Sequence, residues 1–541
     1  MRNGMLRINQ LKLPVGHTKE ELYAKVYKIL RTREIIELRV VRRSVDARKK
    51  PDLFFNYVLD IIVKNEKELY KHCDKKQVAL HKEESYCFPV KEYCGGIRPV
   101  IVGMGPAGLF CGYMLAEAGF RPIILERGKK VEERTADVEL FWKTGKLNQQ
   151  SNVQFGEGGA GTFSDGKLNT LVKDKYGRNR KVLSIFVQKG APEEILYDYK
   201  PHIGTDVLKT VIANMRKQIL EWGGEIRFGA QVTDFEIENR KIKAVLINQK
   251  ERLEAEYVVL APGHSARDTF QTLYDLGIEM EAKPFAVGFR VEHPQEWINQ
   301  AQYGCDIREE LGSAPYKVTA SVGDRGVYSF CMCPGGYVVN ASSEEGRLAI
   351  NGMSYQARDA RNANSAIIVS VTPKDFGSEH PLSGVAFQRK IEEKAYCIGD
   401  GKIPVETYGD FKKAVLPKAE AYMEKKKAFN EQEEILPSIK GQWCMAPVHE
   451  ILPAELNNSF IEGMEQFNKV IKGFADSRVL VEGIESRTSS PIRILRDDRL
   501  QATISGLYPC GEGAGYAGGI TSAAMDGIKV AEEIAKQITA G

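Results

Sequence analysis

The chain has 541 residues, enough for two or three domains with ample hydrophobic cores. Its content of 43% hydrophobic and 27% charged residues is ordinary for a globular protein, and no apolar run approaches the ~20 residues of a membrane helix, which argues against a helical membrane protein. The net charge of +4 conceals an excess of +9 within residues 1–98, so the basic character belongs to the N-terminal segment.

The cysteines and the first residues bear on the compartment. The ten cysteines are scattered, without a C-x-x-C pair or a regular framework, which suits a reducing compartment better than a disulfide scaffold. The opening MRNGMLRINQLKLP contains no continuous apolar segment of the signal-peptide kind. We therefore expect a cytoplasmic protein.

Residues 1–94 are predicted to form a small α+β domain. LRINQLKL alternates apolar and polar residues, KEELYAKVYKIL repeats apolar residues at helical spacing, and IIELRVV and LFFNYVLDIIV are strand-like. The order strand, helix, strand, strand, helix, strand is typical of a ferredoxin-like fold. Between the middle strands, RRSVDARKKPD is expected to form a basic turn.

The basic residues of this turn raise the question of a nucleic-acid partner. A basic patch near Phe55 and Tyr57 would suit RNA, but the sequence has no RNP-type aromatic motif. A solvated basic face, or a contact with the acidic remainder of the chain, is the favoured interpretation. The residues concerned are Arg42, Arg43, Arg48, Lys49 and Lys50.

Beyond a linker at Cys94-Gly95-Gly96, the stretch VIVGMGPAG is predicted to bind a dinucleotide, because a strand here enters a glycine-rich turn and then a helix. Gly103 would make the tight turn, Gly105 would let the backbone approach a pyrophosphate, and Gly108 would let the helix pack on the strand. The free N–H groups of the helix N-terminus would face the phosphates. Glu126 ends the next strand, where an acid would bind a ribose diol.

A second fingerprint, Gly513-x-Gly515-x-x-Gly518, lies near the end of the chain. A complete nucleotide site needs a further strand carrying an acid about 20 residues on. The chain is by then finishing its last helix, so this second site is incomplete. The hypothesis is that it closes the first site.

Eight motifs run through most of the chain: SVDARKK, GMGPAGL, FGEGGAGTFSDGKL, FAVGFRVEHPQ, FCMCPGG, NGMS, ESRTSSPIRI and CGEGAGYAGGITSAAMDG. Together they resemble a bacterial family of uncharacterised FAD-dependent dehydrogenases with a single glutathione-reductase-type FAD-binding fold. The resemblance implies an α/β protein in which a Rossmann-like FAD-binding domain is split by an inserted mixed α+β substrate domain and preceded by the ferredoxin-like α+β domain. The implied parts are the N-terminal domain 1–94, the first FAD part 95–281, the inserted domain 282–440 and the closing FAD part 441–541.

The resemblance also implies a set of FAD contacts. Glu512 would bind the ribityl chain, and the next helix would direct its N-terminal N–H groups at the flavin. The glycine-rich stretch 155–168 would lie against the pyrophosphate and the ring, with a structural Ω-loop as the alternative. The expected FAD-binding residues are Gly103, Gly105, Pro106, Ala107, Gly108, Glu126, Arg127, Gly158, Gly159, Gly161, Thr162, Ser164, Val232, Ala261, Gly263, Gly511, Glu512, Gly519, Ile520 and Thr521.

Five residues are candidates for catalysis or substrate binding. Arg290 and His293 could serve as an anion-binding arginine and an acid/base, although a surface ion pair and a satisfied histidine are equally supported. Arg487, Ser489 and Arg493 lie in ESRTSSPIRI, where two arginines would suit a carboxylate or phosphate of the substrate. An exposed polar loop is the alternative for this stretch.

FCMCPGG places Cys331 and Cys333 two residues apart on one face of a strand. Such a pair could exchange electrons with a flavin as a dithiol. As metal ligands the two cysteines would need a partner pair at metal spacing, which the sequence lacks, so no metal site is expected. Buried structural cysteines are the favoured interpretation.

These observations predict a FAD-dependent oxidoreductase that moves a hydride or electrons between FAD and a small substrate, which the arginines suggest is anionic. NAD(P)H is a candidate transient donor. The alternative function is that of an RNA-associated flavoprotein acting through the basic N-terminal domain. No membrane partner is expected, and the oligomeric state is not predicted.

Overall fold

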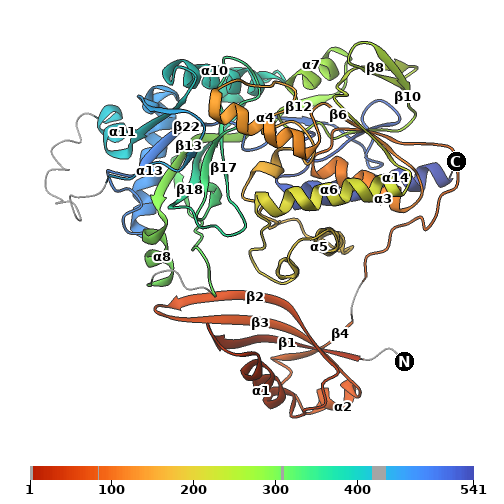
Figure 1. Cartoon of the computed structure of the whole chain (residues 1–541), viewed down its shortest axis with the longest axis vertical. Helices are drawn as coiled ribbons and strands as arrows, with labels where there is room; N and C mark the ends of the chain where they lie inside the picture. The colour runs from red at the N-terminus through yellow and green to blue at the C-terminus, as the bar shows by residue number, and fades with distance from the viewer. Residues whose placement is uncertain (1–3, 83–84, 306–309, 417–433, 541) are drawn as a thin grey trace.

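The computed structural model describes residues 4–82, 85–305, 310–416 and 434–540. In Figure 1 a small N-terminal sheet lies apart from a larger body, which contains two principal sheets. Within the described ranges, no helix is both long and apolar enough to cross a membrane.

The N-terminal sheet is antiparallel and has the order β2-β3-β1-β4, with two helices in the predicted strand–helix–strand–strand–helix–strand sequence. Its apolar face, which includes Leu6, Ile8 and Leu59, packs against Val26 of α1. The elements are β1 (Gly4–Pro14), α1 (Lys19–Leu30), β2 (Glu37–Lys49), β3 (Asp52–Val63), α2 (Glu66–Lys71) and β4 (Val78–His81).

The expected basic turn is part of strand β2, which continues to Lys49 because it pairs with β3 almost to the turn. This strand lies next to the larger body (Figure 1). Arg43 forms an ion pair of 2.8 Å with Asp198, and the Arg42 guanidinium lies 4.2 Å from the centre of the Tyr199 ring. Lys50 also donates from Nζ to the carbonyl of Ala301, so three of the five basic residues contact the remainder of the chain.

The first principal sheet of the body is parallel and has the order β24-β11-β5-β6-β7. The strands β5, β6, β11 and β24 are buried, as parallel strands covered on both sides must be, whereas the edge strand β7 is only partly buried and carries Glu225 and Arg227. Ile101 and Ile124 face helices α3, α6 and α14, whereas Val100 and Val102 face the antiparallel sheet β8–β10. The strands are β5 (Val100–Val102), β6 (Ile123–Glu126), β7 (Glu225–Phe228), β11 (Val258–Leu260) and β24 (Leu507–Pro509).

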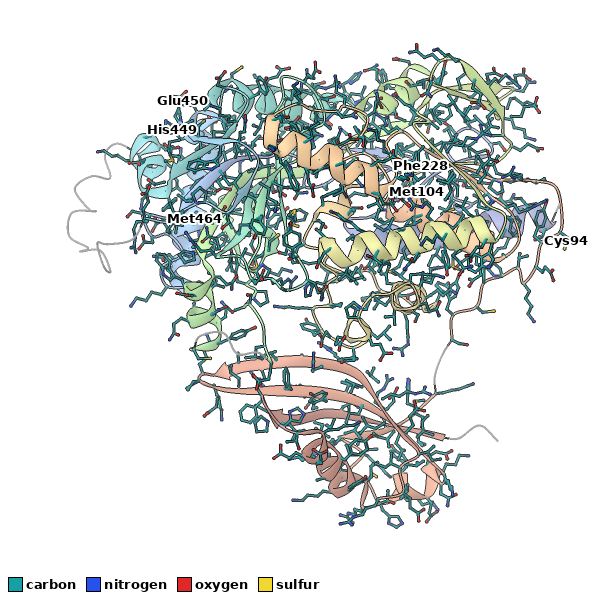
Figure 2. All side chains as sticks on the ribbon, viewed as in Figure 1. Cys94, Met104, Phe228, His449, Glu450 and Met464 are labelled. Carbon is teal, nitrogen blue, oxygen red and sulfur yellow. The ribbon has the colours of Figure 1, made fainter. Side chains whose placement is uncertain are left out.

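Helices and the small antiparallel sheet surround the parallel sheet. Met104 and Phe228 mark this part of the body in Figure 2, where Met464, His449 and Glu450 mark the other. The surrounding elements are α3 (Pro106–Glu117), α4 (Val131–Thr144), η1 (Ala160–Phe163), α5 (Arg178–Gln188), η2 (Glu193–Leu196), α6 (Thr205–Glu221), β8 (Val232–Glu238), β9 (Lys241–Ile247), β10 (Glu251–Glu254), α7 (Arg267–Asp275) and α14 (Ile520–Ala540).

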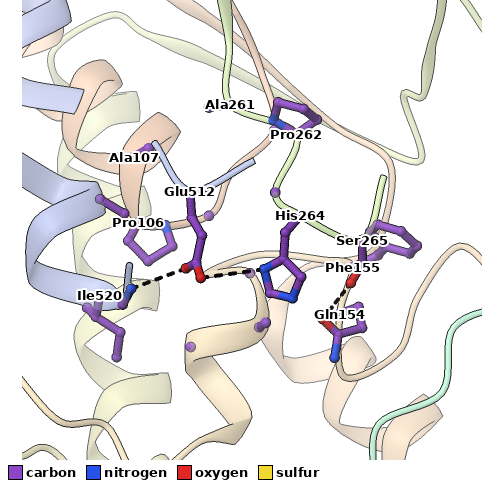
Figure 3. A pocket seen from close by; sticks show the side chains of 18 of the residues that line it. Pro106, Ala107, Gln154, Phe155, Ala261, Pro262, His264, Ser265, Glu512 and Ile520 are labelled. Atoms are coloured by element: carbon purple, nitrogen blue, oxygen red, sulfur yellow. Dashed lines mark hydrogen bonds and ion pairs between the residues drawn. The ribbon is translucent and has the colours of Figure 1, made fainter. Parts of the chain in front are cut away.

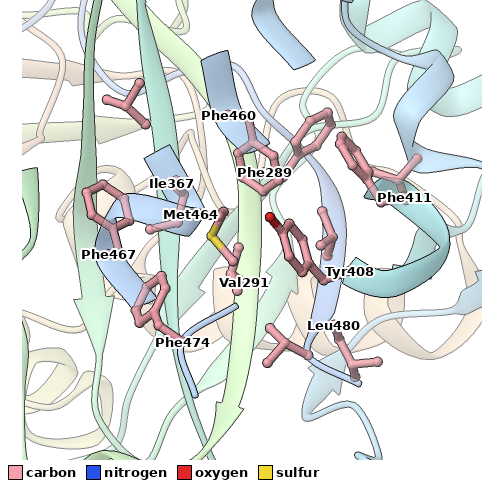
Figure 4. Close-up of a cluster of buried hydrophobic side chains, with 14 of the residues drawn as sticks. Phe289, Val291, Ile367, Tyr408, Phe411, Phe460, Met464, Phe467, Phe474 and Leu480 are labelled. Carbon is pink, nitrogen blue, oxygen red and sulfur yellow. The ribbon is translucent and has the colours of Figure 1, made fainter. Parts of the chain in front are cut away.

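The second principal sheet has seven strands in the order β14-β15-β18-β13-β22-β19-β21. Its core contains Phe289, Val291 and Ile367 from the sheet, packed against Met464 and Phe467 of α13 (Figure 4). The strands are β13 (Phe285–Pro294), β14 (Thr319–Val322), β15 (Arg325–Cys333), β18 (Asn362–Val371), β19 (Ile403–Thr407), β21 (Trp443–Met445) and β22 (Leu480–Glu485).

Smaller elements complete this half of the body. A three-stranded sheet has the order β17-β16-β20, and β12 pairs with β23. The remaining elements are β12 (Met280–Ala282), α8 (Gln295–Tyr303), β16 (Tyr337–Asn340), β17 (Ile350–Met353), α9 (Pro373–Phe376), α10 (Ser383–Ile398), α11 (Tyr408–Val415), β20 (Ile439–Lys440), η4 (Val448–Glu450), α13 (Ala454–Val470) and β23 (Ile492–Ile494).

The predicted domain boundary at residue 440 differs from the strand pairing. β21 and β22 belong to the seven-stranded sheet, and α13 packs on β14, β15 and β18 of the same sheet. Residues 443–485 therefore lie with the inserted part, and it is β24 and α14 that return to the parallel sheet. The apolar strand VLVEGI gave no indication of which sheet it would join.

Candidate functional site

The turn after β5 has the geometry that the first fingerprint predicts. Gly103 has a φ of +97°, and a Cβ there would lie 2.3 Å from the carbonyl oxygen of Ala261. A Cβ at Gly108 would lie 2.0 Å from the carbonyl oxygen of Gly103, so α3 could not pack as closely on β5 with any larger residue. α3 begins with Pro106 at its first turn, where the N–H that proline lacks would have no intrahelical acceptor.

A cavity of about 400 Å³ lies at the carboxyl ends of the parallel strands and extends to the seven-stranded sheet. Open parallel sheets bind ligands at this edge. Figure 3 shows part of its wall, where residues of both fingerprints meet. The predicted FAD-binding residues that line the cavity are Gly103, Gly105, Pro106, Ala107, Glu126, Arg127, Gly159, Gly161, Ser164, Val232, Ala261, Gly263, Glu512, Gly519 and Ile520.

Glu126 is a buried acceptor at one end of the cavity. Its carboxylate accepts hydrogen bonds from the N–H groups of Met104 (2.8 Å), Gly128 (2.9 Å) and Gly156 (3.0 Å). These bonds hold the glycine turn, the end of β6 and the glycine-rich stretch together. Two carboxylate oxygens offer about four acceptor positions, so one remains for a ligand hydroxyl group.

Glu512 also lies in the cavity wall, where its side chain is directed toward His264 (Figure 3). Its carboxylate accepts a hydrogen bond from the N–H of Gly519 (3.2 Å) and lies 3.8 Å from Nδ1 of His264. Burial raises the pKa of Glu512 to about 7. Burial also lowers the pKa of His264 to about 3, so this ring is neutral near neutral pH.

The glycine-rich stretch 155–168 contributes both lining residues and structural residues. Gly158 and Thr162, which the sequence predicted as ligands, do not line the cavity: Thr162 donates its hydroxyl hydrogen to the carbonyl of Glu157 (3.3 Å) and is buried. Asp165 forms an ion pair with Arg358, which fastens the stretch to the seven-stranded half. The Ω-loop alternative is therefore correct for part of this stretch.

Three other predicted FAD-binding residues support the cavity from behind. A Cβ at Gly511 would lie 2.6 Å from that of Ala107, Gly108 packs on the strand, and Thr521 donates its hydroxyl hydrogen to the carbonyl of Leu168 (2.9 Å). Gly108, Gly511 and Thr521 are absent from the cavity wall. Their positions are explained by close packing.

His293 and Arg290 do not line the cavity. Nε2 of His293 is 2.8 Å from the carbonyl oxygen of Phe474, and burial lowers the pKa of the ring to about 4. Nδ1 is buried and has no hydrogen-bond partner among the described residues, so the satisfied-histidine alternative holds for Nε2 alone. Arg290 is completely buried and forms an ion pair of 2.6 Å with Glu485. The alternative of an ion pair at the surface is therefore wrong.

Arg487 and Ser489 line the cavity, but Arg493 does not. The guanidinium of Arg487 is bound to both carboxylate oxygens of Glu392, at 3.0 and 2.9 Å, and to the Ser343 hydroxyl at 2.5 Å. Arg493 is directed to Glu281, 3.6 Å away. The expected pair of arginines for an anionic substrate is therefore not formed.

Several residues of the cavity wall were not predicted. Lys167, Asn351 and Glu485 come from three distant segments that only the assembled sheets bring together. Each lies in a motif noted in the sequence: FGEGGAGTFSDGKL contains Lys167, NGMS contains Asn351 and ESRTSSPIRI contains Glu485. Other such residues are Met104, Gln154, Phe155, Gly156, His264, Ser265, Thr269, Phe330 and Thr488.

Comparison with known proteins identifies related chains. A family described as FAD-dependent protein, C-terminal domain-like, matches residues 284–488, and a domain of unknown function matches residues 5–62. An uncharacterized protein of Clostridium beijerinckii is 44% identical over 540 residues, which is 98% of each chain. This chain belongs to the same family.

Two solved structures resemble this chain only distantly. Glycine oxidase from Bacillus cereus is 12% identical over 82% of this chain and 96% of its own, with a TM-score of 0.33. L-proline dehydrogenase from P. horikoshii is 13% identical over 82% of this chain and 95% of its own, with a TM-score of 0.35. These TM-scores are too low to support an argument about function.

The cavity of this family member fits FAD by its own geometry. The N-termini of α3 and α14, which follow the two fingerprints, adjoin the cavity. Glu126 lines the cavity at the end of β6, the strand that follows α3. A Cβ at Gly518 or Gly519 would meet no protein atom within 4 Å, so a side chain there would occupy the cavity itself. The family that matches residues 284–488 is described as FAD-dependent, and the glycine turns outside that range supply the backbone surface that such a cofactor needs.

Proposed function

We propose that the chain is a FAD-dependent oxidoreductase with a glutathione-reductase-type FAD-binding fold, in which one FAD extends from the turn at Gly103 to the turn at Gly519. The observation that carries the proposal is the single cavity wall shared by the two fingerprints. We assign one nucleotide and not two because the turn at Gly103 and the turn at Gly519 line the same cavity.

The cofactor would be held by groups of this chain at three points. Glu126 would accept a ribose hydroxyl group in addition to its three backbone donors. The N–H groups at the start of α3 would face the pyrophosphate, and those at the start of α14 would face the flavin. When bound, FAD supplies two-electron transfer at its ring.

The residues at the ring end would exchange protons and exclude water. Glu512, with its pKa raised to about 7 by burial, holds or releases a proton near neutral pH. The neutral His264 ring lies beside it. Phe330 and Thr488 border the same part of the cavity and limit the space that a substrate can occupy.

The substrate is proposed to be a small molecule bound between the parallel sheet and the seven-stranded sheet. We do not retain the anionic substrate, because Arg487 is engaged by Glu392 and Arg493 lies elsewhere. NAD(P)H remains the proposed transient donor. Arg42 and Arg43 contact the body of the chain, so nothing in the structure favours the RNA-associated alternative.

Anaerobic reduction of the FAD-loaded protein tests this function. The purified protein would be mixed with NADH, with NADPH and with a panel of small metabolites while the flavin absorbance is followed. Loss of the oxidised-flavin absorbance with at least one reductant is the expected result. A bound flavin that no compound reduces would contradict the proposal.

A further inference from the structure

The end of strand β15 carries a distortion at the cavity. The pairing of β15 with β18 shifts between Phe330 and Cys333, and Cys331 between them has a φ of +44°. A positive φ is uncommon for a cysteine, and bulges of this kind redirect side chains next to active sites. Cys331 is half-buried and lines the cavity, whereas Cys333 is completely buried behind it.

Arg290 positions the two cysteines from behind the wall. Its Nη1 donates to the carbonyl of Cys331 (3.0 Å) and lies 3.8 Å from the sulfur of Cys333. A Cβ at Gly352 would be 2.1 Å from this nitrogen, so the glycine of the NGMS motif makes room for the guanidinium. The ion pair with Glu485, on a third strand, fixes the arginine in place. A residue predicted as catalytic thus supports a pair of thiols.

A second cation reaches the same segment from the glycine-rich stretch. Nζ of Lys167 donates to the carbonyl of Met332, the residue between the two cysteines, and is 3.1 Å from Asp165. Lys167 also lines the cavity, as does Glu485. The charged groups around the thiols therefore include the cations Lys167 and Arg290, and they include the carboxylates Asp165, Glu485 and Glu512.

This environment separates the two thiols electrostatically. The Cys333 thiol, together with Lys167 and Arg290, lowers the pKa of Cys331 well below its usual range despite burial. Burial and the neighbouring sulfur raise the pKa of Cys333 well above its usual range. The pKa values of the two thiols are thus shifted in opposite directions, and a thiol that ionises more readily than its partner is the one that attacks in thiol–disulfide exchange.

Two other buried cysteines, Cys111 and Cys510, provide a comparison with Cys331. Cys111 lies in α3 and Cys510 follows β24, both completely buried and away from Lys167 and Arg290. Burial raises the pKa of both thiols. Cys510 also lines the cavity, so Cys331 differs from both in its partial exposure, its positive φ and the two cations that lower its pKa.

We propose that Cys331 and Cys333 form a redox-active dithiol that exchanges two electrons with the flavin bound in the cavity. The inference rests on the FAD binding proposed above. In the oxidised state the two sulfurs are joined by a disulfide bond. Reduced flavin gives two electrons and one proton to this bond, which breaks to leave Cys331 as a thiolate and Cys333 as a protonated thiol. In the opposite direction the same electrons and proton return to oxidised flavin as the disulfide bond forms.

The test is an anaerobic dithionite titration of the air-oxidised, FAD-loaded protein. The flavin alone accepts two electrons, so a disulfide in exchange with it should raise the uptake to four electrons per flavin. Cys331→Ser and Cys333→Ser should each lower the uptake to two. Cys94→Ser is the matched control, because Cys94 is exposed far from the cavity, and it should keep four.

Mass spectrometry of alkylated wild-type protein gives a second readout that does not depend on any variant. The peptide with both cysteines should be disulfide-linked and unalkylated before the titration, and alkylated at both sulfurs after it. An uptake of two electrons by the wild type, or alkylation of both thiols in the oxidised protein, would overturn the dithiol and leave FAD binding intact. A protein that binds no FAD would overturn the proposed function and the dithiol together.

Discussion

Replacing Glu392 by glutamine should destabilise the protein strongly. Glu392 is completely buried on α10 and binds Arg267 at 2.7 and 2.9 Å and Arg487 at 2.9 and 3.0 Å. Without its charge, two guanidinium groups would remain buried near the single carboxylate of Glu344. Breaking a buried ion pair in this way costs about 3–5 kcal/mol.

The neighbouring Glu393 provides a matched control. It is about half exposed and pairs with Arg347 at 2.8 Å, so Glu393→Gln should cost at most about 1 kcal/mol. In thermal denaturation, about 3–5 kcal/mol in a unit of some 200 residues corresponds to a lowering of Tm by about 10 °C. Equal Tm values for Glu392→Gln and Glu393→Gln would refute the assignment of Glu392 as the centre of a charged network.

The pH dependence of stability tests the same network. Burial opposes the ionisation of Glu344, but Arg389 and Arg267 outweigh it and lower the pKa to about 2, and Arg267 and Arg487 lower that of Glu392 in the same way. A carboxyl whose pKa is lowered on folding stabilises the protein above its unfolded pKa of 4.5. The contribution of the two carboxylates to the free energy of unfolding should therefore disappear as the pH falls from 4.5 to 2. The loss over this pH range should be smaller in Glu392→Gln.

Three further predictions concern the cavity. Glu126→Ala should weaken FAD binding by about 10- to 100-fold in fluorescence titrations, because charge-assisted hydrogen bonds contribute about 1.5–3 kcal/mol. The control variant Glu254→Gln, at an exposed position, should bind FAD normally. Equal affinities of the two variants would contradict the role of Glu126. Gly108→Val should give little folded protein by circular dichroism, because its Cβ would lie 2.0 Å from the Gly103 carbonyl oxygen, and a variant of normal stability would show that α3 packs differently. Burial raises the pKa of Glu512 to about 7, so the folded cofactor-free protein should lose stability as the pH rises from 4.5 to 7. In denaturation experiments, Glu512→Gln should flatten this dependence of the unfolding free energy on pH. An unchanged dependence would argue against the proton on Glu512.

Local signals made the nucleotide turn predictable. Gly103 and Gly108 are required by contacts within one strand–turn–helix unit, and the residue types report that geometry directly. That the second fingerprint closes the first site stays a prediction, although Gly518 and Gly519 line the same cavity as Gly103. The N-terminal part has the order of strands and helices along the chain that the sequence predicted.

Long-range pairing explains what the sequence did not indicate. His293 looked like an acid/base, yet its partner is the carbonyl of Phe474, 181 residues later. Arg487 looked free to bind an anion, yet α10 supplies Glu392 to it from 95 residues earlier. Lys167 reaches the cavity wall opposite Cys331 only because the glycine-rich stretch is fastened to the seven-stranded half. Such partners depend on the assembled sheets, and no local pattern encodes them.

The stoichiometry of nucleotide bound to the purified chain tests the central claim most directly. The protein would be denatured, and the released flavin and nicotinamide nucleotides would be separated and quantified against the protein concentration. Because both fingerprints line one cavity, we predict one FAD per chain and no second tightly bound nucleotide. Two nucleotides per chain, or a protein that takes up no FAD, would contradict the account.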